Sequence, residues 1–134
     1  MNIFVFGSNL SGHHGRGAAL TAKEKYGAKQ HLCCGFQGQA YAIPTKGMRD
    51  ESRPANDKYP ILDILEIEGY VERFLAKAKV HPEHTFLVTR IGCGLAGFTD
   101  EQMAPLFAGA SDNCEFDPAW ASFGLKSWST PPQR

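Results

Sequence analysis

Ile3-Phe4-Val5-Phe6-Gly7-Ser8-Asn9 combines β-branched and aromatic residues with a turn-forming end. Such a run predicts a short buried strand that closes in a turn. The same combination returns later in the chain, where Thr85-Phe86-Leu87-Val88-Thr89 leads into Ile91-Gly92-Cys93-Gly94-Leu95-Ala96-Gly97-Phe98. We therefore expect two buried strands, each of which feeds a glycine-rich loop.

Helical patterns alternate with these strands. We expect one helix over about residues 16–26, ended by Gly27, and an amphipathic helix over about residues 65–79. Thr99-Asp100-Glu101-Gln102 fits a capping box and predicts the start of a third helix. This alternation predicts an α/β domain with three layers, α/β/α, around a mixed, largely parallel sheet.

The remaining segments are less regular. Residues 31–34, 35–38 and 40–43 are interpreted as strand, turn and strand, and residues 45–60 as a polar surface excursion. A last short strand is expected at 114–117 and a frayed tail at 130–134. Trp120 and Trp128 are expected to anchor the C-terminal segment against the core.

The composition is that of an ordinary globular protein, with 43% hydrophobic and 21% charged residues. Lys plus Arg and Asp plus Glu balance at 14 each, so binding to nucleic acid is not expected. No apolar run reaches the roughly 20 residues that span a bilayer, and the first residues do not resemble a signal peptide. We expect a cytoplasmic protein that does not bind membranes; the oligomeric state is left open.

The four cysteines include no C-x-x-C pair, and Cys33 and Cys34 are adjacent. We therefore expect free thiols and no metal site. Nothing in the sequence indicates a cofactor.

The glycine-rich loops indicate a phosphate ligand. Ligands collect at the carboxyl ends of strands in open α/β sheets, and the amides of a helix N-terminus favour anions. Two familiar signatures do not fit. His13-His14 stands where a P-loop that begins at Gly7 needs Lys and Ser or Thr, and Gly15-Arg16-Gly17 lacks the third glycine of a dinucleotide fingerprint.

Three segments resemble the macro domain family, whose members bind ADP-ribose. They are Phe6–Asn9 with Gly15–Ala19, then Gly35–Pro44, and then Ile91–Phe98. Within that family, the whole run resembles a group of compact macro-like proteins of bacteria and their phages. The resemblance implies a single macro-like domain over residues 1–134, with 120–134 as a C-terminal extension. It also implies an ADP-ribose cleft between the two glycine loops. The acidic residue that reads adenine in the family has no counterpart here.

The candidate site follows from the loops and the resemblance together. Asn9, His13 and His14 are candidate catalytic residues, because they could position water if the protein is a hydrolase of ADP-ribosyl or nucleotide derivatives. The expected ligand-binding residues are Gly7, Ser8, Asn9, Gly15, Arg16, Gly17, Ala18, Thr45, Gly92, Cys93, Gly94, Leu95, Ala96, Gly97 and Phe98.

Each of these residues also has an ordinary structural interpretation, as a turn, packing or surface residue. Two other functions therefore stay open. The protein is a non-catalytic protein-interaction module if the glycine loops are only structural. It is a cysteine-dependent transferase if Cys93 is a nucleophile, which requires a lowered pKa.

Overall fold

The computed structural model describes residues 1–133, which form one five-stranded sheet with the strand order β2-β3-β1-β4-β5. The strands are β1 (Asn2–Asn9), β2 (Gly35–Gln37), β3 (Ala40–Lys46), β4 (Thr85–Val88) and β5 (Cys114–Phe116). Only β2 runs antiparallel to its neighbour; the pairs β1–β3, β1–β4 and β4–β5 are parallel. The expectation of a mixed, largely parallel sheet is confirmed.

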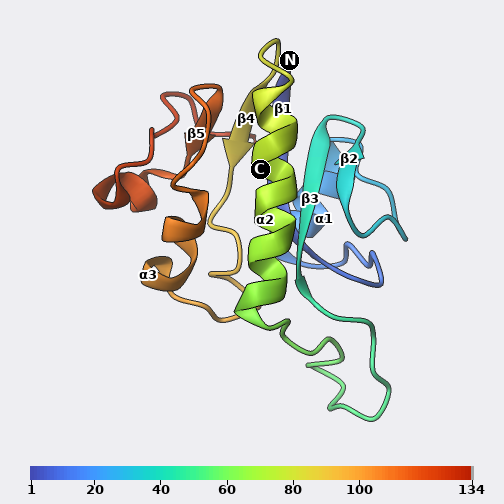
Figure 1. Cartoon of the computed structure of the whole chain (residues 1–134). Helices are drawn as coiled ribbons and strands as arrows, with labels where there is room; N and C mark the ends of the chain where they lie inside the picture. The colour runs from blue at the N-terminus through green and yellow to red at the C-terminus, as the bar shows by residue number, and fades with distance from the viewer. Residues whose placement is uncertain (134) are drawn as a thin grey trace.

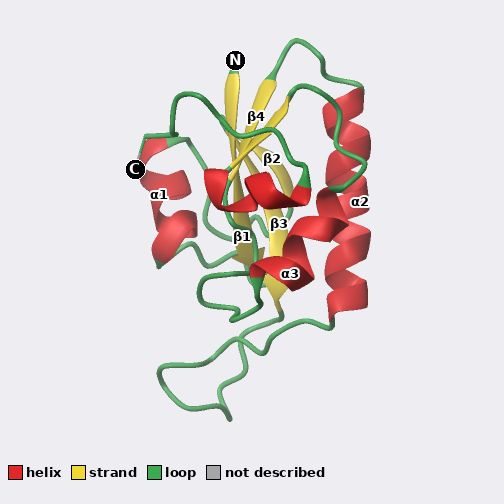
Figure 2. Cartoon of the chain, turned by 90° about the vertical axis from the view of Figure 1, so that its left-hand side faces the viewer, coloured by secondary structure: helices red, strands yellow, loops and turns green. Residues whose placement is uncertain are grey.

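Helices cover both faces of this sheet, which gives the three expected layers (Figure 2). They are α1 (Gly17–Lys25), α2 (Ile64–Lys79), α3 (Asp100–Met103) and the 3₁₀ helices η1 (Ala104–Phe107) and η2 (Pro118–Phe123). α1 lies on one face, and α2 lies on the other face together with α3 and η1 (Figures 1 and 2). Among the described residues no helix has the length and apolar character needed to cross a membrane.

β1 is the central strand and is buried on both faces. Phe4 and Phe6 join the core beneath α1, whereas Ile3 and Val5 join the larger core beneath α2. A strand that has no solvent-facing side needs apolar residues at every position. This explains the uninterrupted run that opens the chain.

α2 owes its position to one apolar stripe. Ile67, Val71, Phe74 and Ala78 are its buried residues, spaced three or four apart. The Asp63 side chain caps the helix by accepting a hydrogen bond of 3.0 Å from the Leu65 amide.

The C-terminal segment packs against the body of the protein. Trp120 and Trp128 are buried, as expected. The expected frayed tail at 130–134 is wrong for the residues described, because Pro132 is buried and the Tyr26 hydroxyl donates a hydrogen bond of 2.8 Å to the Gln133 carbonyl. Arg134 lies outside the described residues.

The segment between α1 and β3 differs from expectation. Residues 31–34 are not a strand, and β2 falls instead on the predicted turn. Gly38 adopts a φ of +60°, and the reversal places it against the carbonyl of Gly27. The hairpin therefore starts later because its turn, at Gly38 and Gln39, is packed against the end of α1.

The expectation of free thiols at Cys33 and Cys34 is also wrong. A disulfide joins these two adjacent residues, where the chain bends before β2. Cys93 and Cys114 are free, and burial raises the pKa of the Cys114 thiol to about 11.

Candidate functional site

The loops after β1, β3 and β4 open at one edge of the sheet, because these strands are parallel and adjacent. A Cβ at Gly7 would lie 3.6 Å from Thr45 Oγ1 and 3.8 Å from the backbone nitrogen of Gly92. The end of β1 therefore touches the end of β3 and the second glycine loop. The sequence-predicted glycine loops lie at the same end of the molecule.

The first loop leads into an open helix N-terminus. Arg16 occupies the N-cap position of α1 in extended conformation, and no side chain caps the helix among the described residues. The first turn of α1 contains no acidic residue. A Cβ at Gly15 or Gly17 would meet no atom within 4 Å. The amide groups at the start of α1 are therefore accessible to an anion.

The second loop is held by internal backbone hydrogen bonds, and its surface is open at Gly94. The Phe98 amide donates to the Gly92 carbonyl at 2.9 Å, and the Gly97 amide donates to the Gly94 carbonyl at 3.0 Å. Gly92 has a φ of +78° and lies against the Met103 side chain, so it serves the turn. A Cβ at Gly94 would meet nothing within 4 Å.

The N-terminus of the helix that follows the second loop, α3, is already capped by side chains. Thr99 and Gln102 form the predicted capping box at the start of α3. Arg90 Nε and Nη2 donate to the two carboxylate oxygens of Asp100 at 3.0 and 2.9 Å, so this guanidinium is already paired. Any anion at the second loop must therefore be held by loop amides.

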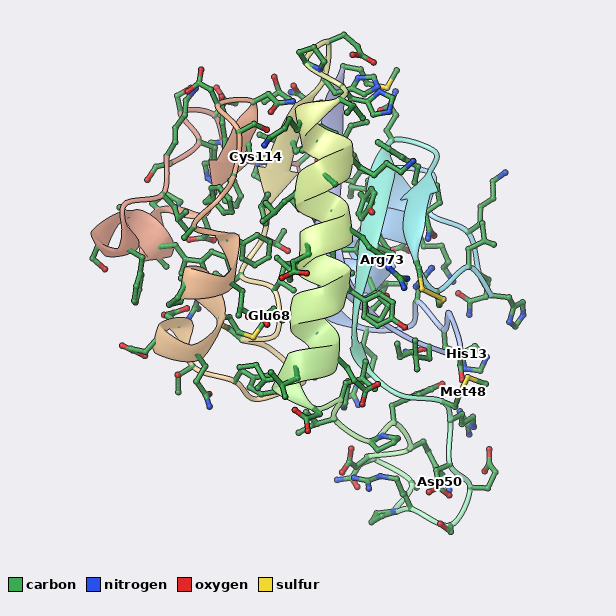
Figure 3. All side chains as sticks on the ribbon, viewed as in Figure 1. His13, Met48, Asp50, Glu68, Arg73 and Cys114 are labelled. Carbon is green, nitrogen blue, oxygen red and sulfur yellow. A yellow bond between two sulfur atoms is a disulfide. The ribbon has the colours of Figure 1, made fainter. Side chains whose placement is uncertain are left out.

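Asn9 and His13 hold the first loop in shape. The Asn9 side chain donates to the His13 carbonyl and accepts from the His13 amide, both at 3.0 Å. The His13 ring is hydrogen-bonded to the Tyr59 hydroxyl, which belongs to the excursion between β3 and α2. Figure 3 shows His13 next to Met48, where this excursion meets the first loop.

His14, one of the three candidate catalytic residues, is buried and makes internal contacts. Its Nε2 donates to Gln37 Oε1 at 3.0 Å, and its ring packs edge-on against Phe6 at 5.2 Å between ring centres. Burial lowers the pKa of His14 below its ordinary value of 6.5. This imidazole belongs to the α1 side of the core, where burial disfavours its charged form.

Three further predicted ligand residues make internal contacts. Ser8 is buried, and its hydroxyl donates to the Cys33 carbonyl at 2.6 Å. Thr45 is buried beside it. Phe98 is half-buried and packs against the α2 side of the core. These side chains position the strand ends and the loop.

Cys93 is half-buried, and burial, followed by the neighbouring Asp100, raises the pKa of its thiol to about 12. A thiol with this pKa is protonated at neutral pH and is not nucleophilic. A raised pKa is the opposite of what a cysteine-dependent transferase requires, so it gives that alternative no support.

The predicted ligand residues that remain exposed are Gly15, Arg16, Gly17, Gly94, Leu95 and Gly97, and they come from both loops. Gly7, Asn9 and Ala18 are half-buried beside them, whereas Ala96 is buried. Four of the six exposed residues are glycines, so much of the exposed surface of the candidate site is backbone, and Arg16 and Leu95 are its exposed residues with side chains.

A hollow of about 520 Å³ lies elsewhere, between α2 and the β2–β3 hairpin. Its lining includes Cys34, Tyr41, Tyr70, Arg73, Lys77 and Val80. Arg73 lies over the Tyr70 ring at 5.2 Å, on the side of α2 that faces β3 (Figure 3). Sequence reasoning missed this hollow because its walls come from separate elements whose spacing carries no shared motif.

The fold and the open loop edge define the chain as a three-layer α/β domain with a mixed sheet. No family model and no curated protein matches the chain. A protein of unknown function from Bacteroides thetaiotaomicron has a similar solved structure, with a TM-score of 0.53 and 14% identity over 95% of this chain and 86% of that one. A second solved structure from the same organism has a TM-score of 0.52 and 15% identity over 79% and 78%. At these identities the likeness concerns the fold alone.

Proposed function

We propose that this protein binds ADP-ribose or a closely related nucleotide diphosphate at the carboxyl edge of the sheet, between the loop after β1 and the loop after β4. One observation carries the proposal: Gly7, at the end of β1, lies against the backbone of Gly92, so the bases of both glycine loops lie at neighbouring strand ends. Parallel sheets bind ligands outside this edge.

The chemistry of the first loop supports an anionic ligand. The uncapped start of α1 presents amide groups at the positive end of the helix dipole. Arg16 makes no ion pair within residues 1–133, and its exposed guanidinium can pair with a phosphate through two donors. At the second loop, Gly94 and Gly97 leave room for a phosphate to approach the backbone.

We propose binding without hydrolysis. The side chains of the three candidate catalytic residues are not free to act together, because His14 is buried and the Asn9 amide group is hydrogen-bonded to the His13 backbone. His13 keeps a half-exposed ring, but that ring is bonded to Tyr59. A general base must reach the proton that it removes, and no pair of these groups offers such an arrangement.

Calorimetric titration with ADP-ribose tests the proposal. Gly94→Glu places a negative side chain in open space at the second loop, and Gly15→Glu does the same at the first loop. Gly109→Glu is the matched control, since it adds the same charge at an exposed turn between η1 and β5 where a Cβ also meets nothing. We expect binding to weaken at least about tenfold in both loop variants, because like charges repel, and to be unchanged in Gly109→Glu.

Other outcomes separate the alternatives. Loss of binding in Lys77→Glu with full binding in Gly94→Glu would place the ligand in the hollow beside α2 and would overturn the proposed site. A ligand at 100 times its dissociation constant stabilises a protein by about 2.7 kcal/mol. If ADP-ribose, AMP and ribose 5-phosphate at millimolar concentration all leave the melting temperature unchanged, the protein is better explained as an interaction module.

A further inference from the structure

Two histidines and a glutamate meet in the turn between α2 and β4. His81, Glu83 and His84 lie at the amino ends of the parallel strands, the edge opposite the glycine loops, at the turn seen at the top of Figure 1. This turn belongs neither to the proposed nucleotide site nor to the hollow beside α2.

The three side chains already point their donor atoms at one another. His81 Nδ1 lies 2.9 Å and His84 Nε2 lies 3.7 Å from the same oxygen of Glu83, Oε2. One donor atom from each residue lies within 4.8 Å of the others. In a tetrahedral zinc site with bonds of about 2.0–2.1 Å, ligand atoms are separated by about 3.3 Å. The two separations from Glu83 Oε2, 2.9 and 3.7 Å, lie on either side of that value, so small side-chain rotations bring each of these nitrogen–oxygen distances to it.

The backbone of the turn is held in place independently of these side chains. The Asn113 amide group donates to the carbonyls of Ala78, His81 and His84 at 2.9, 3.0 and 3.2 Å. The Phe36 ring packs edge-on against the His81 ring, with 5.4 Å between ring centres, and the His84 ring lies 6.3 Å from it. The two imidazoles are thus fixed by packing as well as by the chain.

His84 has a free coordinating nitrogen. Within residues 1–133 neither of its ring nitrogens makes a hydrogen bond: Nδ1 is buried without a partner, and Nε2 is 3.7 Å from Glu83. Its side chain is only 22% exposed. In the tautomer with the proton on Nδ1, the lone pair of His84 Nε2 is directed toward the Glu83 oxygen and His81 Nδ1. A cation bound between these three atoms would be coordinated by that lone pair.

We infer that His81, Glu83 and His84 form a binding site for a divalent transition-metal ion, with zinc as the best match. Imidazole with one carboxylate suits zinc, nickel and copper, whereas magnesium and calcium prefer oxygen ligands throughout. The His81 and Glu83 side chains are 36% and 59% exposed, so a fourth position faces solvent. A site with three protein ligands and an open position binds an exchangeable ion.

The test is titration of the untagged full chain with Co²⁺, followed by visible absorption, and with Zn²⁺, followed by calorimetry. We expect one equivalent of each ion and an intense tetrahedral cobalt spectrum that zinc abolishes. His84→Gln and Glu83→Gln each remove one ligand. His31→Gln is the control, because it removes an exposed histidine of the loop before β2.

We expect both ligand variants to lose the tetrahedral spectrum and to bind zinc at least about tenfold more weakly, a loss that even outer-shell changes cause in metal sites. The His31→Gln protein is expected to match the wild type. Unchanged zinc affinity in His84→Gln, or a wild-type protein that shows no tetrahedral cobalt spectrum, would overturn the inference. Circular dichroism of each variant checks that the fold is retained.

Discussion

Single residues of the first loop divide into those that build the loop and those that are accessible. His13 and His14 are neighbours in sequence, yet one ring is half-exposed against Tyr59 and the other is buried beside Phe6. The sequence could not separate them, because burial depends on which side of the loop faces α1. Gly15 and Gly17, which follow directly, keep their surroundings open.

His14 makes the stability of the protein depend on pH. Burial lowers its pKa in the folded state, and Lys23 adds a smaller effect in the same direction. As the pH falls through 6.5, His14 becomes protonated in the unfolded chain before it does so in the folded chain. The free energy of unfolding therefore decreases with falling pH. Urea unfolding from pH 8 to pH 5 should show this loss, and His14→Gln should reduce its slope. Parallel pH profiles for both proteins would contradict the assignment.

Cys93 should resist thiol reagents in the folded protein. With a pKa of about 12, about one thiol in 10,000 is ionised at pH 8. We expect a thiol-disulfide reagent to detect essentially no fast-reacting thiol in the native oxidised protein and two thiols, Cys93 and Cys114, after denaturation. Reduction before denaturation should raise this number to four, because it opens the Cys33–Cys34 disulfide. Stoichiometric labelling of native Cys93 would reinstate it as a candidate nucleophile.

At the scale of elements, the sequence predicts those whose pattern is local. The helix expected at 65–79 is observed as α2 at Ile64–Lys79, because its apolar stripe repeats over four turns. The strand expected at 31–34 is absent, since the conformation there depends on tertiary contacts with the first loop: the His31 amide donates to the Gly12 carbonyl, and the Cys33 carbonyl accepts from Ser8. Short apolar runs carry too little periodicity to outweigh such contacts.

Asp100 anchors the second glycine loop to the C-terminal segment. Its carboxylate accepts from Arg90 before the loop and from the indole of the buried Trp120 at 2.7 Å. Asp100→Ala leaves the Trp120 N–H without this partner, and we expect a loss of about 1–3 kcal/mol of unfolding free energy. Chemical denaturation measures the loss, with Asp112→Ala as a control at a side chain that is 98% exposed. An effect no larger than that of the control would show that the anchor contributes nothing.

At the scale of the molecule, the sheet brings distant segments together. Local patterns predict strands and loops, but they do not specify that β1 lies between β3 and β4. That order places Gly7 beside Thr45 and Gly92. That both glycine loops lie at the carboxyl edge of the sheet could therefore be predicted from the general behaviour of parallel sheets. The hollow beside α2 and the cluster of His81, Glu83 and His84 could not be predicted in this way.

The larger core depends on α2 as a whole. Phe74 is fully buried and contacts the rings of Tyr41, Phe86 and Phe107, which come from two strands and η1. We expect Phe74→Ala to lower the free energy of unfolding by about 3–5 kcal/mol. Leu65→Ala, at a side chain of the same helix that is 72% exposed, should cost far less. Comparable losses in both variants would mean that α2 does not pack as described.

The central claim is that backbone amides of both glycine loops contact the phosphates of one ligand. The most direct measurement is a ¹H–¹⁵N correlation spectrum of the protein during titration with ADP-ribose. The account predicts that the amide signals of Gly15 and Gly17 shift together with those of Gly94 and Gly97, with one common dissociation constant, while that of Gly109 stays in place. Shifts confined to one loop, or to residues that line the hollow beside α2, would contradict it.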